Sequence, residues 1–292
     1  MIKFHNLKLL MSSKHRIIIE PGSENSNYWK DLWNYRGLFY FLAWRDILVR
    51  YKQTVIGILW SILRPLITII VFTIVFNKLG SFPSDSGVPY AIMVCAGMLP
   101  WQFFSSAFSE SANSLIANSN LLTKVYFPRL IVPASTVIVS LIDFFISFII
   151  LIGLFFYYHF IPDWRILFLP LFLLLATITA MGFGLFIAAL NVKYRDFRYL
   201  IPFIVQFGLY ISPVGFSSNI VYNNANIPQF LKYVYALNPM VGVIDGFRWC
   251  ILGGNSTLHL PQLISSITIS IIFLFIGIWY FRKMEKSFAD VI

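Results

Sequence analysis

The stretch RILFLPLFLLLATITAMGFGLFIAAL, residues 165–190, decides the class of fold. After Arg165 it contains no charged residue, and about 20 helical residues are enough to cross the hydrocarbon core of a membrane. The whole chain has a similar composition: 58% of its 292 residues are hydrophobic and 12% are charged, whereas a soluble domain has about 25% charged residues. The sequence therefore predicts an all-α protein that crosses a membrane several times.

Six apolar stretches are candidates for membrane spans. The fifth is short and contains Pro202 and Pro213, so its ends are the hardest to place. An even number of spans puts both termini on the same side of the membrane. The predicted spans are residues 56–76, 89–108, 131–158, 166–190, 199–214 and 263–281.

The basic residues predict the orientation. Of the 22 Lys and Arg residues, 18 lie in the terminal segments and in the loops on their side; Lys78, Arg165, Lys232 and Arg248 are the exceptions. Loops rich in Lys and Arg stay in the cytoplasm, so both termini are expected there. The net charge of +10 follows from the same bias. Because the chain has no basic soluble domain, nucleic-acid binding is not expected.

The segment NYWKDLWNYRGLFYFLAWRDILVRYKQ, residues 27–53, precedes the first span. In a helix, its aromatic residues gather on one face, with Asp46, Arg50 and Gln53 on the opposite face. Such a helix is expected to lie in the membrane interface, in contact with lipid; the alternative is a helix packed on a cytosolic domain. The residues that define this interface helix are Tyr40, Trp44, Arg45, Ile47 and Tyr51.

Two loops predicted to be cytoplasmic combine aromatic and basic residues. They read NSNLLTKVYFPRLIVP, residues 118–133, and NVKYRDFRYLIP, residues 191–202. The second is expected to form a short helix with Tyr194, Phe197 and Ile201 on one face. Aromatics and Arg are enriched at protein interfaces, so a cytosolic protein is expected to dock here; the alternative is contact with lipid headgroups. The expected interface residues are Lys124, Tyr126, Phe127, Arg129, Tyr194, Arg195, Asp196, Phe197 and Arg198.

The sequence offers no recognisable catalytic or metal site. It lacks the phosphate-binding motif GxxxxGK[ST], the zinc motif HExxH and any close cluster of Cys and His. Cys95 and Cys250 are expected to be unpaired. Asp143, in the middle of the third span, is either a channel-lining carboxylate or a hydrogen-bonding residue between helices. Arg64 either extends to the membrane surface or contacts phosphate at a channel entrance.

Five blocks in order resemble the type-2 ABC transporter permeases that export polysaccharides. The resemblance covers the chain from about Gly37 to the C-terminus. The blocks are WRDILVRYKQTVIGILW with LRP (44–60, 63–65), AGMLPWQFFSSAFSESANSLIANSNLLTKVYFPRLIVP (96–133), NVKYRDFRYLIPFIVQFGLYISPV (191–214), LNPMVGVIDGFRW (237–249) and EKSFADVI (285–292).

This resemblance implies a homodimer in a bacterial inner membrane, with two cytosolic ATPase subunits that carry the ATP and Mg. The two basic-aromatic loops would be coupling helices, and residues 215–255 would form short re-entrant gate helices at the outer mouth. A polyprenyl-pyrophosphate-linked polysaccharide, most readily O-antigen, would be the substrate. The implied parts are a cytoplasmic extension (1–36), a transmembrane domain (37–284), a cytoplasmic tail (285–292) and an outer gate with Asn238, Pro239, Phe247 and Arg248.

Three alternatives remain open at this point. A wall teichoic acid exporter differs only in its substrate. An ion-driven transporter would need several buried titratable residues, whereas Asp143 is the one expected in mid-span. A membrane-bound transferase would need an acid–base pair that the sequence does not reveal.

Overall fold

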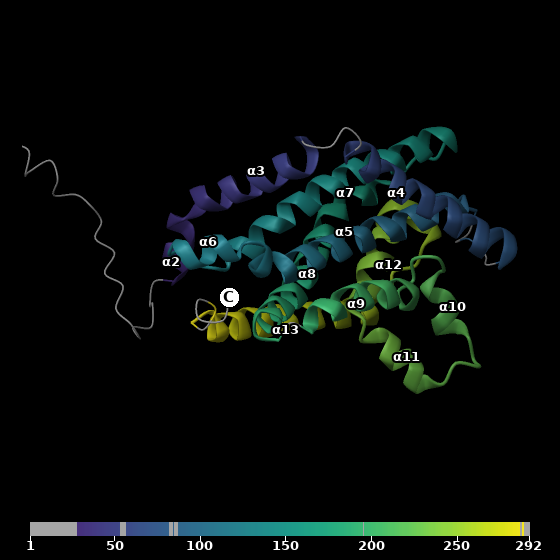
Figure 1. Ribbon diagram of the computed structural model, residues 1–292. Coiled ribbons are helices and arrows are strands. Elements are labelled where there is room, and N and C mark those ends of the chain that lie inside the picture. The colour runs from purple at the N-terminus through teal and green to yellow at the C-terminus, as the bar shows by residue number, and fades with distance from the viewer. Residues whose placement is uncertain are drawn as a thin grey trace, which may run out of the picture.

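The computed structural model of the protein describes residues 28–52, 57–81, 84, 87–194, 196–286 and 288. Within these residues every regular element is a helix (Figure 1). Five helical stretches are long and apolar enough to cross a membrane: Leu59–Leu79, Tyr90–Ala117, Ile131–Tyr157, Trp164–Lys193 and Leu260–Glu285. The predicted class, an all-α protein with several membrane-crossing helices, is confirmed.

The helices follow one another with short connections. In chain order they are α2 (Tyr28–Asn34), α3 (Arg36–Lys52), α4 (Gly57–Phe72) with its π-helical continuation η1 (Thr73–Leu79), α5 (Tyr90–Ala117), α6 (Ser119–Lys124), α7 (Ile131–Tyr157), η2 (Trp164–Phe168), α8 (Leu169–Lys193), α9 (Phe197–Ile211), α10 (Ser218–Asn223), α11 (Gln229–Ala236), α12 (Pro239–Leu252), η3 (Gly253–Asn255) and α13 (Leu260–Glu285).

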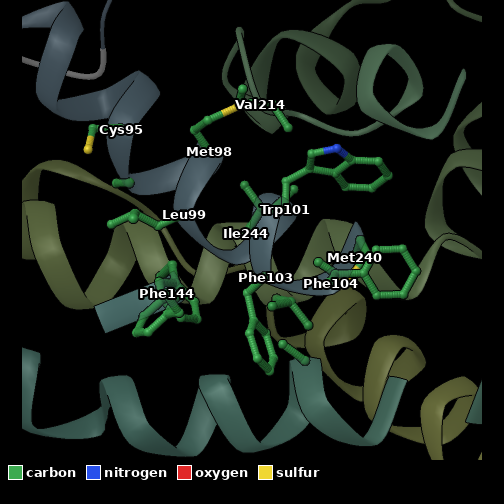
Figure 2. Packing of buried hydrophobic residues seen from close by; sticks show 14 of the residues in the cluster. Cys95, Met98, Leu99, Trp101, Phe103, Phe104, Phe144, Val214, Met240 and Ile244 are labelled. Atoms are coloured by element: carbon green, nitrogen blue, oxygen red, sulfur yellow. The ribbon is translucent and has the colours of Figure 1, made fainter. Parts of the chain in front are cut away.

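Helix α5 lies at the centre of the bundle. It packs against α7, α8 and α12, and α13 packs on α8. Small residues such as Ala96, Gly97 and Ala107 let the neighbouring backbones come close to α5. Figure 2 shows large side chains of α5 in the main core: Phe103 lies near Phe144 of α7, with ring centres 5.9 Å apart, and Trp101 points elsewhere, against Gly208 of α9. The main core is therefore built around α5.

The bundle has two distinct ends (Figure 1). At one end lie α2, α6 and the last turns of α13, and we call this the α6 end. A second hydrophobic cluster forms there, joining Leu122, Phe127, Val192 and Phe281. Because Val192 directly precedes the connection from α8 to α9, that connection lies at the α6 end as well. The opposite end, which carries α10 and α11, is the α10 end.

The largest difference between the predicted and observed boundaries is at the end of the second span. The second span was expected to end at residue 108, but α5 continues to Ala117. Its polar residues look like a loop in the sequence, yet they bond within the helix: Asn113 donates to the carbonyl of Ser109 (2.8 Å) and Ser114 to that of Ser111 (2.7 Å).

The fifth predicted span is the short helix α9. Its 15 residues extend over about 22 Å, which is less than the hydrocarbon thickness of about 30 Å. The number of six spans therefore stays a prediction.

Candidate functional site

At the α10 end, the side chain of a buried arginine donates hydrogen bonds to the segment that follows α9. Arg248 of α12 is 1% exposed. Its Nη1 donates to the carbonyl of Phe216 (2.6 Å) and its Nη2 to that of Val214 (3.0 Å). The hydroxyl of Tyr90 donates to the carbonyl between them, that of Gly215. Three successive carbonyls outside any helix are thus hydrogen-bonded inside the protein, as buried backbone requires.

The other predicted gate residues also lie inside the fold. Asn238 caps α12 by accepting from the backbone N–H of Met240 (3.0 Å), and its side-chain nitrogen donates to Ser212 (2.9 Å). Pro239 occupies the first turn of α12, where a backbone N–H has no acceptor within the helix, so its absence removes no helical hydrogen bond. Phe247 is fully buried. The structure thus has short helices in residues 215–255, as expected, and these four residues fix α12 in place.

Two polar residues of this region were not singled out from the sequence. Asp245 is buried and accepts a hydrogen bond from Ser218 of α10 (2.6 Å). Ser218 also contacts the hydroxyl of Tyr235 in α11 (3.3 Å). Asp245 therefore links the three short helices to one another. The signal that could have revealed it is the charged pair in VIDGFRW, since charges in an apolar segment need partners.

At the α6 end, the first predicted interface loop divides into an exposed and a buried part. Lys124 and Tyr126 are exposed, whereas Phe127 is 3% exposed and belongs to the second hydrophobic cluster. The backbone N–H of Arg129 donates to the Glu285 carboxylate (2.8 Å), and its guanidinium donates to the Glu285 carbonyl. Phe127 and Arg129 thus bind this loop to the end of α13, whereas Lys124 and Tyr126 remain on the exposed surface.

The second predicted interface loop is a turn between the long helix α8 and the shorter helix α9. The expected separate helix is wrong: α8 ends at Lys193, Tyr194 has an extended backbone, and α9 begins at Phe197. Arg195 lies outside the described residues. Tyr194, Asp196 and Arg198 are exposed, while Phe197 is half-buried against the main core. Tyr194 is therefore the more exposed of the two aromatic residues in this turn.

The predicted interface helix is α3, which packs along α7 (Figure 1). Its aromatic face points outward: Tyr40 and Trp44 are exposed, with stacked rings whose centres are 6.5 Å apart. Ile47 is half-buried, and Leu42 and Ala43 are the buried residues of this helix. The outward aromatic face is what an amphipathic helix presents to lipid.

Tyr51, predicted on the aromatic face of α3, packs against the bundle, and so does Arg50 of the predicted charged face. The Nη2 of Arg50 lies 2.7 Å from the Asp143 carboxylate of α7, and its Nη1 is paired with Glu110 of α5. The hydroxyl of Tyr51 also donates to Asp143, and Ser61 of α4 contacts the same carboxylate at 3.3 Å. Burial and the bond to Asp143 raise the pKa of Tyr51, so its hydroxyl remains a donor.

These contacts show that Asp143 bonds between helices, and a channel-lining role for its carboxylate stays a prediction. The sequence did not reveal Glu110, the second carboxylate paired with Arg50, because that residue was assigned to a loop. Arg64 of α4 is exposed and, among the described residues, its guanidinium has no hydrogen-bond or ion-pair partner. Nor do the described residues bring together three His, Cys, Asp or Glu side chains that could hold a metal. Cys95 and Cys250 are free thiols.

Comparison with known proteins agrees with this architecture over nearly the whole chain. The O-antigen export system permease protein RfbA of Myxococcus xanthus is 25% identical over 264 residues, which cover 90% of this chain and 98% of that protein. A protein of the same name from Klebsiella pneumoniae is 26% identical and covers 85% and 92%. The polysialic acid transport protein KpsM of Escherichia coli is 22% identical and covers 83% and 92%.

The family described as ABC-2 type transporter matches residues 37–252. The matched region begins in α3 and ends with α12, so it includes Arg50 with its two carboxylates, both loops at the α6 end and the short helices of the α10 end. The chain belongs to the ABC-2 type transporter family.

Proposed function

We propose that the protein is the transmembrane subunit of an ATP-driven exporter that moves lipid-linked O-antigen polysaccharide out of the cytoplasm. The observation that carries this proposal is the similarity to two O-antigen export permeases, which extends over 85–90% of this chain and 92–98% of theirs. Similarity over nearly the full length of these relatives supports the same kind of subunit.

ATP hydrolysis is assigned to a separate cytosolic subunit, present in two copies beneath a homodimer of this chain. The sequence has no GxxxxGK[ST] motif that would hold the phosphates of ATP. ATP and Mg would therefore bind to the partner. The exposed residues Lys124, Tyr126, Tyr194 and Arg198 at the α6 end support docking there, because they combine aromatic rings with positive charge.

The orientation follows from the Lys and Arg bias. The α6 end is assigned to the cytoplasm and the α10 end to the outer side of the bacterial inner membrane. Lipid-linked polysaccharide, with polyprenyl pyrophosphate as its carrier, would enter near the α6 end and leave past α10–α12. Arg64, an exposed cation of α4, is suited to contact the pyrophosphate.

A capsule exporter is the second candidate, and the similarity to KpsM favours it. A wall teichoic acid exporter, the alternative that the sequence left open, differs from both in substrate and cell envelope. All three share one mechanism, in which a separate ATPase drives a polymer through the permease.

Deleting the gene in its native bacterium tests the proposal. We expect lipopolysaccharide to lose its O-antigen ladder while lipid-linked polymer accumulates inside the cell, and plasmid-borne wild-type gene to restore the ladder. Loss of capsule with an unchanged ladder would favour the capsule candidate. If no surface polysaccharide changes and no lipid-linked polymer accumulates, the proposed function is wrong.

A further inference from the structure

One guanidinium joins three helices of the bundle. Arg50 of α3 pairs through Nη1 with Glu110 of α5 and through Nη2 with Asp143 of α7, the latter at 2.7 Å. Both carboxylates also contact hydroxyls: Ser140 lies 3.4 Å from Glu110 and Ser61 lies 3.3 Å from Asp143. We call Arg50, Glu110 and Asp143 the charge cluster. Since its members come from three helices, breaking it releases α3 from both α5 and α7.

The charge cluster holds one cation against two carboxylates. The side chain of Asp143 is 16% exposed and those of Arg50 and Glu110 are 36% and 30% exposed, so water screens them only in part. Burial opposes the charge of Arg50, but Glu110 and Asp143 raise the pKa of Arg50, so it remains a cation. Removing Arg50 leaves two neighbouring negative charges, whereas removing one carboxylate leaves a matched pair.

Helix α3 depends on these polar contacts for its position. Its buried residues are Leu42 and Ala43, and much of its apolar surface points outward. A second polar contact lies further toward the α6 end: Nη2 of Arg45 donates to Oδ1 of Asn118 at 2.7 Å. Asn118 caps the end of α5 and directly precedes α6. Hydrogen bonds and ion pairs therefore hold α3 at two levels of the bundle.

These two contacts make α3 a physical connection across the bundle. Arg45 and Arg50 are five residues apart in one helix, a rise of about 7.5 Å. A displacement of α6 moves Asn118, and Arg45 passes the displacement to α3. Arg50 then passes it to α5 and α7 at the level of Asp143, inside the predicted membrane region.

We propose that Arg50 is a positioning residue, and that its ion pairs with Glu110 and Asp143 couple movement at α6 to the membrane-crossing helices α5 and α7. The proposal rests on the proposed function, because the partner ATPase supplies the movement at α6. Arg50 touches neither ATP nor polymer in this scheme. Its substitution is expected to lower the amount of polymer exported per ATP hydrolysed, while the permease still inserts and the ATPase still binds.

The charge cluster makes a specific prediction about charge matching. Arg50→Gln leaves two unpaired carboxylates, and Glu110→Gln combined with Asp143→Asn leaves an unpaired cation. Both should release α3. Glu110→Gln alone, or Asp143→Asn alone, leaves a matched pair and should be tolerated. The triple variant with all three substitutions contains no charge and should restore the position of α3 in large part.

The first measurement is hydrogen exchange of residues 36–52 in the full-length permease in lipid nanodiscs, with Lys52→Gln as the control on exposed α3 surface. Arg50→Gln and the double carboxylate variant are expected to speed exchange of α3 about tenfold. Each single carboxylate variant and the triple variant should stay within about threefold of wild type. Arg50→Lys, whose single ammonium cannot pair with both carboxylates in the same way, should be intermediate.

The second measurement uses the same variants with the cognate ATPase and counts polymer exported per ATP hydrolysed. This ratio should be lower in the variants whose α3 exchanges faster. We expect it to fall about fivefold in Arg50→Gln and to recover in the triple variant. A ratio that is unchanged while α3 exchanges faster would mean that the cluster is structural only, and would overturn the proposal. So would single carboxylate variants as damaging as Arg50→Gln, or no recovery in the triple variant. If the wild type exports no polymer at all, the proposed function fails, a result distinguishable from failure of the charge pattern alone.

Discussion

Gly277 of α13 lies directly against the backbone of Gly182 of α8. A Cβ atom added to Gly277 would come within 2.4 Å of the carbonyl oxygen of Gly182. Near this contact, the hydroxyls of Thr179 and Ser270 are hydrogen-bonded at 2.7 Å. The two helices therefore meet backbone to backbone, the arrangement through which small residues favour helix association in lipid.

Gly277→Val is expected to destabilise the packing of α13 on α8 by about 1–3 kcal/mol, because the contacting atom is backbone and cannot rotate away. Gly153→Val is a matched control, since Gly153 also lies in a long apolar helix but has no atom within 4 Å of its added Cβ. Thermal unfolding of the purified proteins in detergent measures the difference. Equal unfolding temperatures for the two variants would contradict the close crossing.

Arg248→Gln should loosen residues 212–217 at the α10 end. The substitution removes two hydrogen bonds from a charged donor to the carbonyls of Val214 and Phe216, each worth roughly 1.5–3 kcal/mol. Hydrogen exchange in this segment should accelerate and the unfolding temperature should fall. Lys232→Gln serves as the control, because Lys232 donates one bond, to the Tyr222 carbonyl, from a half-buried position. An Arg248 variant no more perturbed than the control would show that the carbonyls find other partners.

Tyr194→Ala should detach the partner ATPase more than Arg198→Ala. Both side chains are exposed, but at protein interfaces buried aromatic anchors can cost 2 kcal/mol or more when truncated, and charges at the rim cost little. Co-purification of the ATPase with each variant measures the effect, after normal insertion has been verified. If the turn contacts lipid headgroups instead, the order reverses, because charge then dominates.

Labelling of single cysteines should show that the two ends of the bundle face opposite sides of the membrane. Ala225, between α10 and α11, and Asn120, in α6, are both exposed. In intact cells, a membrane-impermeant thiol reagent should label Ala225→Cys and leave Asn120→Cys unlabelled until the membrane is opened. The native thiols of Cys95 and Cys250 are buried and give little background. Labelling of Asn120→Cys from outside would reverse the proposed orientation.

Hydropathy predicted the membrane-crossing helices because the signal lies within each stretch of about 20 residues. The short helices of the α10 end were predictable for a similar reason, since proline and glycine interrupt an apolar segment. The end of α5 was misplaced because hydropathy assigns polar residues to loops. In the folded chain, Asn113 and Ser114 instead bond to carbonyls of their own helix.

The charge cluster could not be predicted in this way. Arg50 is 60 residues from Glu110, and Tyr51 is 92 residues from Asp143. Their contacts depend on the angle at which α3 packs against the bundle, and no local pattern encodes that angle. The burial of Phe127 could not be predicted from a local pattern either. Its position among basic residues suggested an exposed anchor, but the end of α13 covers it.

Reconstitution tests whether a separate ATPase drives the export of polymer through this permease. The purified permease is placed in proteoliposomes with lipid-linked polysaccharide, with or without its cognate ATPase, and ATP hydrolysis and polymer translocation are measured together. We expect the permease alone to hydrolyse no ATP and to move no polymer, and we expect both activities only when the ATPase and ATP are present. ATP hydrolysis by the rigorously purified chain alone, or polymer movement driven by an ion gradient without the ATPase, would show that a separate ATPase does not drive export.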